Sequence, residues 1–129
     1  MQDQDKLKYL KIALNVFGVI LIVGLFAMMN WIFPEGWAWT PRQPEYEQMI
    51  MGVYATLGVF LIRAAKDPMA NVSLIWFTVW SSIVHGGIML VQAIVDETEQ
   101  ANLLGDIPAL FLLAFVLWYL MPKQAGSTN

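Results

Sequence analysis

Apolar residues gather in long stretches that short polar segments separate. An α-helix needs about 20 mostly apolar residues to cross the hydrocarbon layer, where it satisfies its own backbone hydrogen bonds. Pro34 follows the first stretch and Pro122 follows the last, and proline cannot continue a helix. The pattern predicts an all-α fold, an integral membrane four-helix bundle. Its helices are expected at about Leu10–Phe33, Tyr46–Ala65, Leu74–Val95 and Leu103–Met121.

The connecting segments are short, so no soluble domain is expected on either side of the membrane. The transmembrane domain is expected to cover 10–121, after a cytoplasmic N-terminal segment, 1–9, and before a cytoplasmic tail, 122–129. The first stretch follows several lysines, as a signal peptide does, but it is about twice as long as a normal signal h-region. It also lacks a small-x-small cleavage site, so we expect it to remain as the first helix.

Basic residues are distributed unevenly about the predicted helices. If the helices alternate in direction, all but one of the seven Lys and Arg residues fall on one side. Only Arg42 falls on the other side, among most of the acidic residues. Lysine and arginine concentrate on the cytoplasmic side of membrane proteins. Both termini are therefore predicted to be cytoplasmic.

Composition excludes several classes of protein. Hydrophobic residues make up 58% of the 129 residues and charged residues 13%, about half of the ~25% that is usual in soluble domains. A soluble domain of this size could not bury so much apolar surface. The absence of cysteine excludes disulfides and thiolate metal sites. A net charge of −3 argues against nucleic acid as a partner and leaves the lipid bilayer as the expected environment.

The third predicted helix carries a line of polar side chains. Ser81, His85, Met89, Gln92 and Asp96 recur at spacings of three and four residues, which places them on one helix face. Polar side chains within a membrane usually face other helices. We therefore expect this face to be turned toward the rest of the bundle.

A comparable line on the second helix contains Glu47 and Tyr54. Together the two lines indicate a polar track that leads from the outer surface to the middle of the membrane, with Glu47 and Asp106 at its mouth. Such a track would line an outward-facing cavity. The candidate ligand-binding residues are His85, Tyr54, Gln92, Glu47 and Ser81.

His85 is open to several interpretations. It can be a neutral imidazole that fixes helix register through a hydrogen bond, or it can serve as a proton relay, a ligand contact or a metal or haem ligand. Met89 lies one turn from His85, and thioethers favour Cu(I), so these two residues with Met51 or Met29 are the candidate metal ligands. Methionine is also ordinary filler in irregular cores. The sequence assigns no cofactor.

No phosphate-binding loop, serine elbow or zinc signature occurs in the chain, and no nucleophile–base pair can be named, so an enzyme is not expected. We expect an interaction or accessory subunit, as a homo-oligomer or as part of a larger membrane complex, with a small ligand bound near His85. The alternatives are a small proton-coupled transporter or permeation unit and a membrane copper or redox site that uses His85 and Met89.

The segment 46–93 resembles small bacterial four-helix inner-membrane proteins, in Y-E-Q-M-I-M-G-V-Y-A-T-L-G-V-F-L-I-R-A-A-K-D-P and then W-F-T-V-W-S-S-I-V-H-G-G-I-M-L-V-Q-A. Its G-x-Y-x-x-x-G part, formed by Gly52, Tyr54 and Gly58, also looks like the DoxX-like group of four-helix proteins. The resemblance implies a multi-pass helical bundle in a bacterial inner membrane. It gives no residue a role and establishes no activity.

Overall fold

The computed structural model describes residues 2–38 and 41–122, and every regular element in these ranges is helical. The all-α prediction is confirmed. Most of the predicted tail, 122–129, lies outside the described residues, and the predicted N-terminal segment is helical from Asp3. In chain order the elements are α1 (Asp3–Val19), η1 (Ile20–Gly24), α2 (Leu25–Ala27), η2 (Met28–Ile32), α3 (Pro34–Trp37), α4 (Pro44–Ala64), η3 (Pro68–Asn71), α5 (Val72–Val95), η4 (Glu97–Leu104) and α6 (Asp106–Leu120).

Two helices in the described part of the chain are long and apolar enough to cross a membrane. They are Asp3–Ile32, which runs without a break from α1 to η2, and Pro68–Val95, which joins η3 to α5. The axes of η4 and α6 meet at an angle of 41°, and together they form a third candidate membrane helix if they act as one span. A chain with two or three such helices has the composition of a membrane protein.

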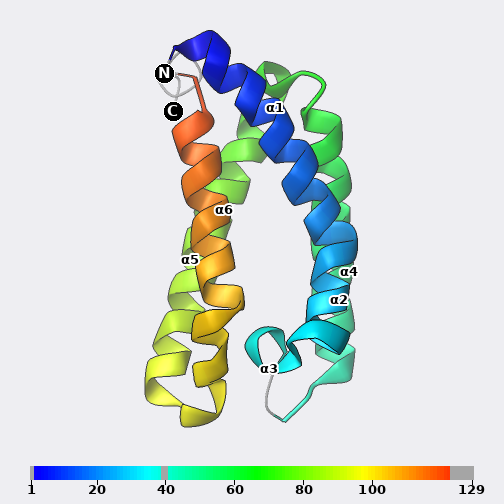
Figure 1. Cartoon of the computed structure of the whole chain (residues 1–129), viewed down its shortest axis with the longest axis vertical. Helices are drawn as coiled ribbons and strands as arrows, with labels where there is room; N and C mark the ends of the chain where they lie inside the picture. Colours follow the sequence, from blue (N-terminus) through cyan, green and yellow to red (C-terminus); the bar gives the residue numbers. More distant parts are fainter. Residues whose placement is uncertain (1, 39–40, 123–129) are drawn as a thin grey trace.

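The helices form two pairs (Figure 1). α1 and η1 pack along α4, and α5 packs along α6. The pairs meet at one end of the molecule and diverge toward the other, where α3 lies between them. α1 begins and α6 ends at the end where the pairs meet, and there Lys6 Nζ lies 5.1 Å from the centre of the Tyr119 ring.

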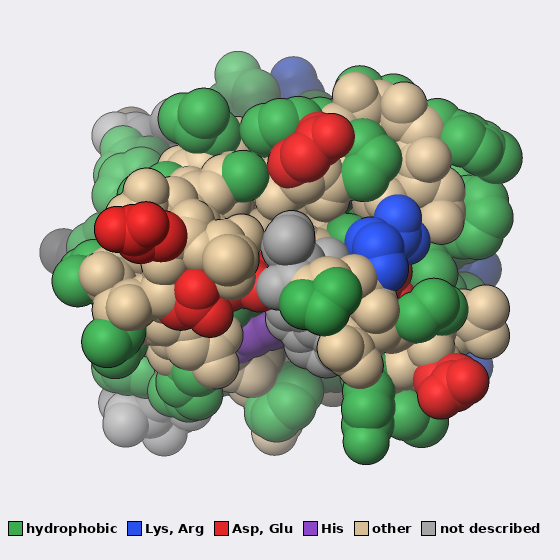
Figure 2. Space-filling view, turned by 90° about the horizontal axis from the view of Figure 1, so that it is seen from below, with side chains coloured by type: hydrophobic (Ala, Val, Ile, Leu, Met, Phe, Trp, Pro, Cys, Tyr) green, Lys and Arg blue, Asp and Glu red, His purple; other side chains and the backbone are tan. Residues whose placement is uncertain are grey.

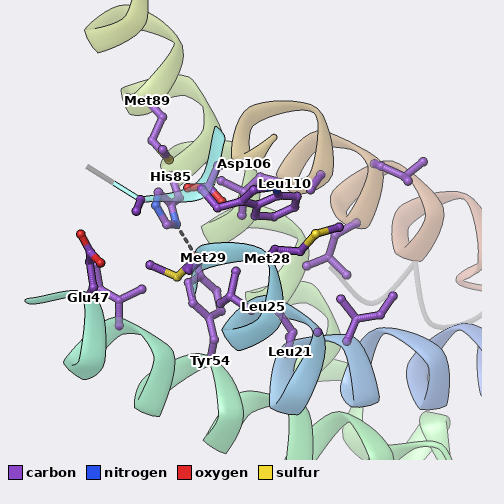
Figure 3. Close-up of a pocket in the computed structure, with 18 of the residues that line it drawn as sticks. Leu21, Leu25, Met28, Met29, Glu47, Tyr54, His85, Met89, Asp106 and Leu110 are labelled. Atoms are coloured by element: carbon purple, nitrogen blue, oxygen red, sulfur yellow. Dashed lines mark hydrogen bonds between the residues drawn. The ribbon is translucent and has the colours of Figure 1, made fainter. Parts of the chain in front are cut away.

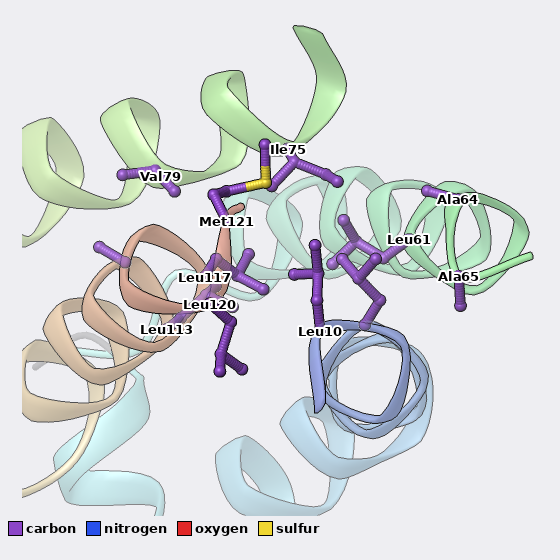
Figure 4. Packing of buried hydrophobic residues seen from close by; sticks show 12 residues of the cluster. Leu10, Leu61, Ala64, Ala65, Ile75, Val79, Leu113, Leu117, Leu120 and Met121 are labelled. Carbon is purple, nitrogen blue, oxygen red and sulfur yellow. The ribbon is translucent and has the colours of Figure 1, made fainter. Parts of the chain in front are cut away.

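A hydrophobic core holds the pairs together at this end (Figure 4). Lipid tails are as apolar as leucine, so close packing rather than exclusion of water stabilises such contacts within a membrane. The core residues that have no exposed surface come from every long helix: Leu10 and Leu14 of α1, Leu61 of α4, Ile75 of α5 and Leu117 of α6.

The backbones of α1 and α4 touch where two glycines meet. A Cβ atom added to Gly58 would lie 2.5 Å from the carbonyl oxygen of Gly18, and one added to Gly18 would lie 2.7 Å from the carbonyl oxygen of Gly58. Only glycine permits this approach. A Cβ atom added to Gly52, in contrast, would meet nothing within 4 Å. Of the two glycines in the G-x-Y-x-x-x-G segment, Gly58 therefore lies in a close helix contact and Gly52 does not.

Candidate functional site

A cavity of about 620 Å³ lies between the two helix pairs, where they diverge (Figure 3). Its wall is mostly apolar and includes Leu21 and Leu25 from the first helix and Leu110 and Leu113 from α6. Its volume falls within the ~300–1,000 Å³ of typical small-ligand sites, which are apolar with a few polar groups. The wall of this cavity has the same character.

The first helix forms one side of the cavity with its two π-helical turns, η1 and η2. The lining residues Ile20 and Gly24 belong to η1, and Met28, Met29 and Ile32 belong to η2. A π turn widens the helix by one residue, and such turns occur often at functional sites. The sequence analysis did not anticipate them, because an apolar helix with π turns has the same residue types as one without.

His85 and Tyr54 link the two pairs across the cavity. The Tyr54 hydroxyl on α4 hydrogen-bonds His85 Nδ1 on α5, and the two rings stack at 13° with their centres 5.8 Å apart. When the hydroxyl donates to Nδ1, the neutral imidazole carries its hydrogen on Nε2. That N–H then remains as a donor for a ligand.

Packing between α5 and α6 accounts for the direction in which His85 points. A Cβ atom added to Gly86 would lie 3.2 Å from the Phe111 ring and 3.4 Å from Leu110 Cβ, so α6 lies directly against Gly86. His85 directly precedes Gly86, so its side chain points to a different side of α5, toward α4. The face of α5 that is buried deepest along this part is Ser82, Gly86, Met89 and Ala93.

The predicted polar line on α5 is therefore only partly buried. Met89 is buried, whereas Gln92 is exposed although it lines the cavity, and Asp96 is exposed beyond the end of the helix. Helix periodicity predicts which residues share a face, but the glycine contact with α6 decides which face is covered.

Glu47 is 2% exposed and is held by Arg42. Arg42 Nη2 donates to Glu47 Oε1 at 2.6 Å, Arg42 Nε donates to the same oxygen at 2.9 Å, and the backbone N–H of Gln43 donates to Oε2 at 2.9 Å. The hydrogen bond to Glu47 raises the pKa of Arg42 above its ordinary value. The charge of Glu47 is thus compensated at the cavity wall, a pairing that the sequence analysis did not identify.

Asp106 is the other acidic residue in the wall. It is the first residue of α6 and points toward the same part of the cavity as His85 (Figure 3). Among the described residues, its carboxylate makes no hydrogen bond or ion pair. Asp106 was predicted at the mouth of the track but was not among the candidate ligand-binding residues.

The remaining candidates lie elsewhere. Ser81 is absent from the cavity wall, and its hydroxyl donates to the carbonyl of Thr78 at 3.3 Å. Met51 is absent from the wall and packs against a cluster that contains the lining residue Met29, whereas Met89 shares the wall with His85. Within the described ranges, no group of three or more His, Cys, Asp or Glu side chains is placed to hold a metal ion.

At the end where the helix pairs diverge, the cavity is bounded by the segment around α3. Trp37 and Ala38 line the cavity, and Gly36 lies against Gly105, where a Cβ atom would lie 2.6 Å from the Gly36 carbonyl carbon. Figure 2 looks at this end of the molecule, where acidic side chains lie around a hollow. The chain's single histidine, His85, is visible in that hollow.

The described chain is all-helical, has two or three helices long and apolar enough to cross a membrane, and contains an apolar cavity with a few polar groups. A family model described as a family of unknown function, DUF6632, matches residues 5–128, and the chain belongs to this family. Comparisons with curated proteins and with solved structures found no match.

Proposed function

We propose that the protein is a multi-pass membrane protein that binds a small, largely apolar ligand between its two helix pairs, next to His85. The observation that carries this proposal is the cavity of about 620 Å³, with its apolar wall and its polar groups from several helices. Tyr54, His85, Gln92 and Asp106 provide hydrogen-bonding groups there. A cavity of this kind is the usual form of a small-ligand site.

The proposed topology has four membrane helices with both ends in the cytoplasm of a bacterium, in its inner membrane. α4 is long enough to cross, and its charged residues lie in its first and last turns: Glu45 and Glu47 at the start, Arg63 at the end. The start of α1 and the end of α6 share one end of the molecule, as this topology requires. The resemblance to bacterial four-helix proteins, including the DoxX-like group, supports the same count.

The proposed role is that of an interaction or accessory subunit, as a homo-oligomer or within a larger membrane complex. Large apolar side chains cover much of the exposed helix surface: Val53 is 68% exposed, Ile94 70% and Trp31 73%. Such faces suit lipid and neighbouring helices. The connecting segments between the helices are too short to hold a separate partner-binding domain.

Native mass spectrometry from mild detergent tests the ligand proposal. The wild-type protein is expected to carry a co-purified small molecule, and His85→Leu is expected to lose it. Ser81→Ala is the matched control, because Ser81 lies one turn earlier on α5 and outside the cavity wall. Retention of the bound molecule in His85→Leu, or its absence from the wild-type protein, would contradict the proposal.

A copper or redox site is the second candidate, because Met89 lines the same cavity as His85 one helical turn away. Metal analysis of the same purified sample distinguishes a copper site from a site for a small organic ligand. Copper near one equivalent per chain, lost in Met89→Leu, would favour the metal site over the organic ligand.

A further inference from the structure

The charged side chains that face the cavity are acidic. Glu47 and Asp106 lie in the wall, and none of the lining residues that the structure describes is Lys or Arg. The guanidinium of Arg42, which pairs with Glu47 in the wall, is bound to that carboxylate. The Asp106 carboxyl group therefore faces the cavity without a basic side chain beside it in the described wall.

The two carboxylates differ in what compensates them. Glu47 accepts hydrogen bonds from Arg42 and from the backbone of Gln43. Asp106 has no such partner in the described part of the chain. The N-terminus of α6 favours a negative charge at Asp106, but it leaves the carboxylate oxygens that face the cavity without a donor. A carboxylate in a largely apolar cavity is stabilised when a positive group pairs with it.

Aromatic side chains belong to the same cavity wall as this carboxylate. Trp37 and Tyr54 both line it, and aromatic faces attract organic cations. The rest of the wall, with Leu21, Leu25 and Leu110, suits an apolar body. The cavity thus offers a counter-ion, aromatic surface and apolar volume together.

We infer that the cavity binds an organic cation with an apolar body, such as a lipophilic amine or an onium ion, and that Asp106 is its counter-ion. This inference rests on the proposed binding function and specifies its ligand class. It makes the sign of the ligand's charge the property that decides binding.

Two ions of the same shape and opposite charge test the inference. Isothermal titration calorimetry of the full chain in neutral detergent, against a detergent blank, compares tetraphenylphosphonium with tetraphenylborate. The cation is expected to bind at least tenfold more tightly than the anion. Asp106→Asn is expected to weaken cation binding at least tenfold, whereas Asp106→Glu and Glu45→Gln retain it. Glu45 is the matched control, because it is an exposed carboxylate outside the cavity wall.

The outcomes separate this inference from the proposed function. Equal binding of the two ions, or an unchanged cation affinity in folded Asp106→Asn, overturns the inference and leaves a cavity that binds apolar ligands. If neither ion binds and the native mass spectrum shows no small molecule, the proposed function fails as well. If Asp106→Asn does not fold, the comparison of the two ions on the wild-type protein decides.

Discussion

The contact between Gly18 and Gly58 offers a direct test of the packing between α1 and α4. In Gly58→Ala, the new methyl group would lie 2.5 Å from the Gly18 carbonyl oxygen and 2.9 Å from Ile22 Cγ1. The first of these neighbours is backbone, so the methyl group cannot be accommodated by a change of side-chain rotamer. The two helices must separate.

Forced overpacking of this kind typically costs about 1–3 kcal/mol. We expect the free energy of unfolding of Gly58→Ala to fall by about that amount. Alanine is a better helix former than glycine by roughly 1 kcal/mol in exposed positions, which offsets part of the loss. Gly52→Ala is the matched control, because its methyl group would meet nothing within 4 Å. It should leave stability unchanged or slightly raised.

Unfolding by a denaturing detergent in mixed micelles, followed by tryptophan fluorescence, measures both variants. The double variant Gly18→Ala, Gly58→Ala should lose less stability than the two single losses added together, because both methyl groups push apart the same contact. Equal stabilities of Gly58→Ala and the wild type, or equal losses in Gly58→Ala and Gly52→Ala, would refute the reasoning.

Two other predictions concern charged groups at the start of α4 and just beyond the end of α5. Arg42→Ala leaves the buried Glu47 carboxylate with fewer hydrogen-bond donors and should lower the free energy of unfolding by about 1–3 kcal/mol. The loss is limited because water can replace part of the half-exposed guanidinium, and the additional change Glu47→Gln should restore some of it. Thermal unfolding that shows no loss of stability in Arg42→Ala would contradict this prediction. Hydrogen bonds from the side chain and backbone of Thr98 lower the pKa of Asp96. These bonds therefore stabilise the fold at pH values above the ordinary aspartate pKa. Their contribution to stability disappears as the pH falls through the lowered pKa. Thr98→Val should therefore raise the pKa of Asp96 in a carbon-13 NMR titration, and an unchanged value would count against these hydrogen bonds.

Hydropathy and proline positions were enough to predict the helical class. They could not predict η1 and η2, because the backbone angles there stay close to those of an α-helix and no special residue type is needed. A shift of hydrogen bonding by one residue leaves no trace in the hydrophobic pattern.

The structure brings some of the candidate residues together and leaves others apart. The spacing on α5 and α4 pointed to His85 and Tyr54, which do meet in the cavity. Ser81 shares the helix face but not the cavity, since Gly86 brings α6 against the neighbouring face. The periodicity of one helix contains no information about which neighbour covers it.

The Arg42–Glu47 pair was missed for a different reason. Its members lie on either side of the start of α4, where no regular spacing relates side chains. Asp106 belongs to the wall because the helix pairs diverge at that end, which is a property of the whole fold.

The central claim is that the His85 side chain lies between the two helix pairs and not against lipid, and cross-linking tests it most directly. The chain has no cysteine, so introduced pairs can be cross-linked in membranes with a short bis-maleimide. Tyr54→Cys combined with His85→Cys is expected to cross-link within one chain. Tyr54→Cys combined with Val84→Cys should not, because Val84 is 58% exposed and outside the cavity wall. Cross-linking of position 84 but not of position 85 would contradict the account.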